Sequence, residues 1–234
     1  MATISQTNTQ LSHPASTISY WKLKDPASAI THFIAMLLAL CSMPFLLVKA
    51  SAYTDFRYPL ASFLFIFSMV LLYGASASYH AITTTQKKTQ LLKKLDHIMI
   101  YFLIAGSYSP ICLLVLPESI GLPLFYLVWG FAIAGFILTL FWVDSPKWLN
   151  STIYIVMGWL CIFAIRSIYL YLSREAFYWL LAGGIIYTIG GIIYALKLPL
   201  FNSLHKEFGS HEIFHLFVMA GSFCHFVMVY CFLL

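Results

Sequence analysis

Two histidines stand four residues apart near the C-terminus, in the stretch HEIFH at positions 211–215. Residues at this spacing lie one turn apart on the same face of an α-helix, so that both imidazoles can reach one metal ion. No charged residue follows His215, and a long apolar run of this kind is typical of a membrane-spanning helix. The pair is therefore predicted to stand at the mouth of a membrane helix, where other segments would supply the remaining groups of a site.

The composition places most of the chain in lipid. Of the 234 residues, 61% are hydrophobic and 9% are charged, whereas about 25% are charged in an ordinary soluble domain. The net charge of +5 comes from basic residues that lie between apolar runs, and this pattern argues against a nucleic-acid partner. The five cysteines lie inside apolar runs without a CxxC pair, so we expect reduced thiols.

Charged residues divide the chain into seven apolar runs. The runs lie between residues 25 and 49, 57 and 87, 96 and 118, 118 and 144, 147 and 166, 175 and 197, and after 212. A helix needs roughly 20 residues to cross a bilayer, and the fifth run reaches that length if its helix continues through Arg166 to about Leu172. The sequence predicts an all-α bundle of seven transmembrane helices in residues 25–234, after a flexible N-terminal tail of residues 1–24.

The distribution of lysine and arginine predicts the orientation of this bundle. With a cytoplasmic N-terminus, nine basic residues fall on the inner side: Lys22, Lys24, Lys87, Lys88, Lys93, Lys94, Lys147, Lys197 and Lys206. Three fall on the outer side: Lys49, Arg57 and Arg174. The positive-inside rule therefore favours a cytoplasmic N-terminus and an external C-terminus.

This topology brings further polar residues to the inner end, where the histidine pair lies. The second helix ends there with Ser76 and His80 on one face, and the third helix is expected to carry Asp96 in its first turn. Ionisable groups at membrane depth usually face the bundle interior and are functional candidates. We expect His80, His211 and His215 to bind Zn²⁺ with a water molecule as fourth ligand. Asp96 would hold or deprotonate that water, and Ser76 would hydrogen-bond the water or a developing oxyanion.

Some of these polar residues also have purely structural interpretations. An aspartate at a helix start is commonly a cap or a partner of the helix dipole, and Ser76 can bond to a carbonyl of its own helix. His225 lies ten residues beyond His215, roughly 15 Å along the helix axis, and is expected to be a buried hydrogen-bonding residue. His32, near the inner end, is expected to be a packing residue, with a role in supporting the metal ligands as the alternative. His97 points about 100° away from its neighbour at position 96 and is a second candidate for such a supporting role.

The stretch at 211–215 also matches HExxH, the zinc-protease signature in which the glutamate is the general base. A zinc protease needs a third ligand, but no Asp or Glu follows His215, and Gly221 stands where the extended signature requires histidine. Glu212 is rotated about 100° from the histidine face and suits the N-terminus of a helix. Intramembrane proteolysis is therefore the weaker hypothesis.

Together the polar motifs resemble those of the hemolysin III family, the bacterial branch of the progestin and adipoQ receptor superfamily, which includes the adiponectin receptors. The matching stretches are AITH at 29–32, SASYHA at 76–81, LDHIMIY at 95–101, AGSYSP at 105–110, GGIIYTIG at 183–190, HEIFH at 211–215, and Gly221-Ser222 with His225.

The resemblance implies a seven-helix bundle with a cytoplasmic N-terminus and a zinc site in the inner leaflet. It assigns the zinc ligands to His80, His211 and His215, the water-linking carboxylate to Asp96, and the motif serine to Ser76. It also implies a relation to lipid amide hydrolases that resemble ceramidases.

Two classes of function remain open. The first is a zinc-dependent hydrolase of a lipid amide or ester, with a membrane lipid as substrate, in a bacterial inner membrane. The second is a non-enzymatic sensor or regulator of membrane lipid or energetic homeostasis, with zinc as a structural element. A pore or transporter is disfavoured because the ionisable residues cluster at one end instead of forming a chain across the bilayer.

Overall fold

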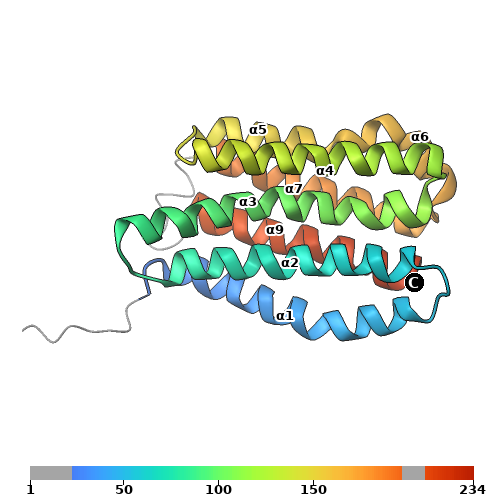
Figure 1. Cartoon of the computed structure of the whole chain (residues 1–234), viewed down its shortest axis with the longest axis horizontal. Coiled ribbons are helices and arrows are strands. Elements are labelled where there is room, and N and C mark those ends of the chain that lie inside the picture. The colour runs from blue at the N-terminus through green and yellow to red at the C-terminus, as the bar shows by residue number, and fades with distance from the viewer. Residues whose placement is uncertain (1–22, 197–208) are drawn as a thin grey trace, which may run out of the picture.

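The computed structural model describes residues 23–196 and 209–234, and within these ranges the secondary structure is entirely helical. Seven helical segments are long and apolar enough to cross a membrane. They lie side by side along the long axis of the molecule (Figure 1). The predicted all-α, seven-helix architecture is therefore confirmed, while residues 1–22 of the predicted tail lie outside the described residues.

In the described residues, four of the seven spans are single α-helices, two end in a π-helical turn and one is broken. The long helices are α1 (Pro26–Ser51), α2 (Arg57–Ala81), α4 (Glu118–Phe141), α7 (Arg174–Leu196) and α9 (Ser210–Met228), the last extended by a π-helical turn at Val229–Leu233. The third span is α3 (Gln86–Pro110) with a π-helical turn at Ile111–Val115. The fifth span consists of α5 (Lys147–Gly158), a 3₁₀ turn at Leu160–Ala164, and α6 (Ile165–Tyr171).

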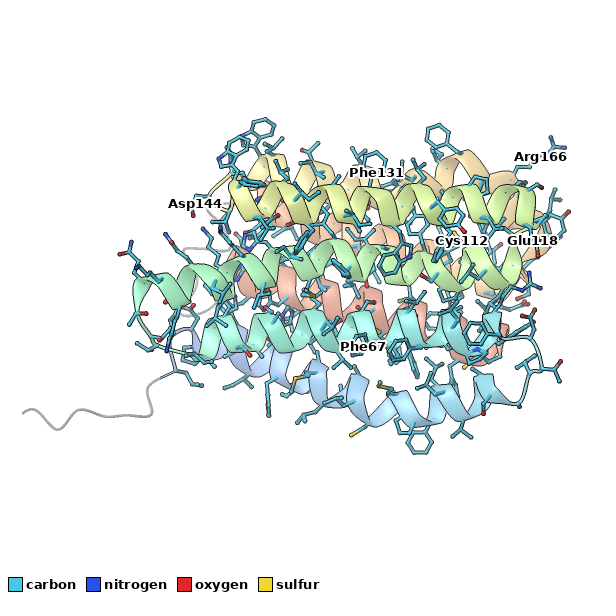
Figure 2. All side chains as sticks on the ribbon, viewed as in Figure 1. Phe67, Cys112, Glu118, Phe131, Asp144 and Arg166 are labelled. Carbon is cyan, nitrogen blue, oxygen red and sulfur yellow. The ribbon has the colours of Figure 1, made fainter. Side chains whose placement is uncertain are left out.

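The fifth span has the predicted length, but it is not one continuous helix. A break in an α-helix frees backbone groups, which in lipid must find partners inside the protein. Tyr108 of α3 provides them, because its hydroxyl donates to the Gly158 carbonyl at 2.6 Å and accepts from the Cys161 amide at 2.9 Å. Arg166 follows the break and is exposed at the far end of the bundle (Figure 2).

The third span begins earlier than the sequence predicts. Helix α3 starts at Gln86, ten residues before Asp96, so the lysines expected in a loop occupy its first turns. Their long side chains reach out of the helix: Lys93 pairs with Asp144, and Lys94 donates to the Leu140 carbonyl. The Lys93 ammonium also holds the pKa of the Asp144 carboxyl below its ordinary value. Because Asp96 lies well inside α3, its interpretation as a helix cap is wrong.

One end of the bundle collects the residues of interest. Helix α2 ends there, and α3 and α9 begin there; we call it the histidine end. Asp144 also lies at this end, whereas Glu118 and Arg166 lie at the opposite end (Figure 2). Helix α9 runs through the middle of the bundle, packed against α7 on one side and α1 on the other (Figure 1). A side chain on α9 can therefore contact helices that are distant in sequence.

Candidate metal centre

Three histidines meet at the histidine end. His80 comes from the last turn of α2, and His211 and His215 come from the first two turns of α9. One ring nitrogen of each residue lies within 4.8 Å of the other two, and His80 and His215 are buried while His211 is partly buried. The structure therefore brings together the three histidines that the sequence analysis selected, and together they could hold a metal ion.

The spacing of one pair of ring nitrogens is close to that of a tetrahedral metal site. Nitrogen ligands at about 2.0–2.1 Å from a tetrahedral ion lie about 3.3 Å from one another. His80 Nε2 and His211 Nε2 are 3.0 Å apart. Nδ1 of His215 is buried without a hydrogen-bond partner in the described part of the chain. A buried polar nitrogen without a partner is costly.

His80 is held by a carboxylate that the sequence analysis treated only as the end of an apolar run. Asp25, the residue before α1, places Oδ2 3.0 Å from His80 Nδ1, and its backbone amide donates to the His80 carbonyl at 2.9 Å. A carboxylate on Nδ1 fixes the tautomer that leaves Nε2 free for a metal. The two residues are 55 positions apart, so no local spacing could have revealed the pair.

We expect Asp25→Ala to weaken zinc binding about 10- to 100-fold, because partners of this kind orient the ligand and raise its basicity. Competition titration with a chelator would measure the change in the zinc dissociation constant. Asp55→Ala is the matched control, since Asp55 pairs with Arg57 outside this cluster. Equal zinc affinities for the wild type and Asp25→Ala would show that Asp25 does not position His80.

The glutamate of the HExxH stretch is engaged away from the histidines. Glu212 accepts from the Ser28 hydroxyl at 2.7 Å and from the Gly209 amide at 2.8 Å. It therefore closes the first turn of α9 and ties that turn to α1, which agrees with its interpretation as a residue of a helix N-terminus. This arrangement gives no support to a role as the base of a zinc protease.

His32 packs directly on the cluster. Its ring is stacked on that of His215, with the centroids 3.6 Å apart and the planes 8° from parallel. Its side chain is buried, and neither ring nitrogen has a hydrogen-bond partner among the described residues. The expectation of a packing residue near the inner end is therefore confirmed, and the surface it packs against is a candidate metal ligand.

Asp96 and Ser76 share a cavity with two of the histidines. Both line the same space as His211 and His215, in the interior between the helices. Asp96 is only 6% exposed, and Ser76 is fully buried. The Ser76 hydroxyl makes no hydrogen bond to its own helix in the described residues, so that interpretation is wrong. Both side chains are thus placed to act on a ligand inside this cavity.

The remaining candidate histidines, His97 and His225, each lie close to a backbone carbonyl. His97 turns back to its own helix, where Nδ1 lies 2.9 Å from the Lys93 carbonyl. His225 is buried near the middle of the membrane span, and its Nε2 lies 3.3 Å from the Leu180 carbonyl of α7. The prediction that His225 is a buried hydrogen-bonding residue is therefore confirmed.

The fold and the cluster define a class: multi-pass helical membrane proteins with three histidines gathered at one end of the bundle. The chain belongs to the family of haemolysin-III related proteins, whose family model matches residues 20–226. The predicted membership of the hemolysin III family is therefore confirmed.

Individual relatives agree with this assignment. The chain is 39% identical over 211 residues to a hemolysin-3 homolog of Bacillus subtilis, which covers 88% of this chain and 93% of that protein. It is 39% identical over 197 residues to hemolysin-3 of Bacillus cereus, and this match covers 84% of this chain and 85% of that protein. A stretch of 58 residues is 38% identical to an adiponectin receptor protein of Drosophila melanogaster and covers 24% of this chain and 13% of that protein. This shorter match is consistent with the wider superfamily.

Proposed function

We propose that the protein is a zinc-dependent hydrolase that cleaves an amide or ester bond of a membrane lipid. The observation that carries this proposal is a cluster of three histidines that opens on an internal cavity lined by Asp96 and Ser76. Three histidines with one open position are a donor set of catalytic zinc sites. When bound, the ion would polarise a carbonyl and supply a water nucleophile at neutral pH.

The protein's own residues have distinct roles in this proposal. His80, His211 and His215 hold the ion, and Asp96 accepts the proton of the attacking water. The Ser76 hydroxyl, which is buried and lines the cavity, donates to the carbonyl oxygen as negative charge develops on it. The apolar walls of the cavity hold the acyl chain and keep bulk water away from the reacting bond.

The proposal includes an orientation, with the N-terminus and the histidine end in the cytoplasm and the C-terminus outside. The described basic residues support it, because six lie towards the histidine end: Lys24, Lys87, Lys88, Lys93, Lys94 and Lys147. Four lie towards the opposite end: Lys49, Arg57, Arg166 and Arg174. The positive-inside rule then favours this orientation, and the bacterial relatives make a bacterial inner membrane the proposed location.

A second candidate is a non-enzymatic sensor or regulator of membrane state in which zinc is structural. It is favoured by one observation: the three histidines come from α2 and α9, so an ion would link these two helices, and Asp25 ties His80 to the start of α1. In that case zinc removal would lower the melting temperature, and lipid turnover would be absent in every preparation.

Release of fatty acid from a lipid panel tests the hydrolase proposal. Zinc-loaded protein in mixed micelles would be incubated with ceramides, N-acylethanolamines and phospholipids, and free fatty acid would be measured by mass spectrometry. We expect release from at least one lipid class, and no release by a His211→Ala/His215→Ala variant. Full zinc occupancy without release from any lipid would overturn the proposal in favour of the second candidate.

A further inference from the structure

The cavity extends far beyond the histidine cluster. Along α7 it is lined from Tyr194 in the last turn to Phe177 in the first. These residues are 17 positions apart, which corresponds to roughly 25 Å of helix and approaches the thickness of about 30 Å of the hydrocarbon core. Near Phe177 the lining is apolar, with Ile165, Ile168 and Leu180. A chain-like ligand that entered at the histidine end would thus pass the whole middle of the bundle.

A group of three hydroxyls lies beside the middle of this cavity. Tyr73 of α2 donates to the Ser222 hydroxyl of α9 at 2.6 Å. The Tyr187 hydroxyl of α7 lies 2.7 Å from the same oxygen. Tyr73 and Ser222 are buried, while Tyr187 lines the cavity. Ser222 is seven residues beyond His215, roughly 10 Å along the axis of α9. The three hydroxyls therefore lie further from the histidine end than the histidine cluster does.

Hydrogen-bond counting shows that this group has a donor to spare. Each of the three hydroxyls carries one proton. The group makes two hydrogen bonds, and Ser222 takes part in both of them. If Ser222 donates to Tyr187, the Tyr187 proton is free; if Tyr187 donates to Ser222, the Ser222 proton is free. In either arrangement one proton has no acceptor in the described part of the chain, and the first arrangement places it on Tyr187, which lines the cavity.

His225, whose ring packs against Tyr187, adds a spare acceptor. Its ring packs edge-on against Tyr187, with the centroids 5.4 Å apart. Because Nε2 donates to the Leu180 carbonyl, Nδ1 is the unprotonated nitrogen and can only accept. Nδ1 is buried without a partner in the described residues, and His225 also lines the cavity.

We infer that Tyr187, Ser222 and His225 form a subsite that binds a hydroxyl group in the middle of the ligand's acyl chain. A hydroxyl matches the subsite because it can accept the spare proton and donate to His225 Nδ1 at once, whereas a methylene can do neither. The subsite lies roughly 10–15 Å along α9 from His215. This inference rests on the proposed function, since it names the class of lipid that the hydrolase would take: one with a mid-chain hydroxylated acyl group.

Oleate and ricinoleate are suitable probes, because they share chain length and double bond and differ by one mid-chain hydroxyl. Binding of each to the purified zinc-loaded protein would be measured by calorimetry in mild detergent. We expect the wild type to bind ricinoleate about tenfold more tightly, the effect of one or two net hydrogen bonds. Tyr187→Phe should abolish this preference and leave the affinity for oleate unchanged.

Tyr154→Phe is the matched control. Tyr154 also lines the cavity, but its hydroxyl donates to the His97 carbonyl away from the subsite, so the preference for ricinoleate should persist. Equal affinity of the wild type for the two probes, or failure to bind either, would overturn the subsite. Because binding is measured without turnover, a ricinoleate preference in a protein that cleaves no lipid would support the subsite and refute the hydrolase.

Discussion

Replacing Asp96 with asparagine is expected to lower lipid hydrolysis by about 10²–10⁴-fold, the usual contribution of a general acid or base. Asparagine has the shape of aspartate but cannot take up a proton at neutral pH. Asp96 is buried and lines the cavity together with His211 and His215. Fatty-acid release and zinc content would be measured on the same preparation, and the zinc content should stay near that of the wild type.

Asp144→Asn provides the control for this experiment. Asp144 lies at the same end of the bundle but is exposed and pairs with Lys93 outside the cavity, so its variant should retain wild-type hydrolysis. Undiminished hydrolysis by Asp96→Asn would exclude Asp96 as the base. Loss of zinc from Asp96→Asn would instead assign Asp96 to metal binding.

A methyl group at Gly106 is expected to destabilise the bundle. A Cβ built there lies 2.1 Å from the Ser68 hydroxyl oxygen and 2.8 Å from the Leu64 carbonyl oxygen. Because the second atom belongs to the backbone of α2, helices α2 and α3 must separate. Overpacking of this kind costs about 1–3 kcal/mol or more. It would also move Asp96 on α3 away from His80 on α2.

Thermal unfolding in detergent would measure this effect. Gly130→Ala is the matched control, because a Cβ at Gly130 meets no atom within 4 Å. The higher helix propensity of alanine should leave that variant as stable as the wild type or slightly more stable, by up to about 1 kcal/mol. If Gly106→Ala melted no earlier than Gly130→Ala, the close packing of α2 against α3 would be wrong.

The spans could be predicted from the length of apolar runs, and the histidine cluster from the spacing of residues along a helix. Seven apolar runs separated by charges specify seven membrane helices, since lipid tolerates few charges. The four-residue spacing of His211 and His215 places both on one helix face. The alternation of inward and outward helices then brings His80 to the same end. None of these steps requires knowledge of packing.

Helix boundaries and contacts between distant helices could not be predicted in the same way. The charge criterion began the third run at Asp96, but α3 already starts at Gln86. The lysines of its first turns are tolerated because their side chains reach polar partners outside α3, Asp144 and the Leu140 carbonyl. The break after Gly158 depends on a hydroxyl of another helix, that of Tyr108. Likewise, the contact of Asp25 with His80 joins residues that only the tertiary fold brings together.

Metal content is the measurement that tests the central claim most directly. Elemental analysis would compare the wild type, His211→Ala/His215→Ala, and His97→Gln, whose ring nitrogen Nδ1 faces the Lys93 carbonyl of its own helix. We predict about one zinc per chain in the wild type and His97→Gln, and almost none in the double variant. A well-folded wild type that holds no metal even after zinc loading would contradict the account of the histidine cluster as a metal centre.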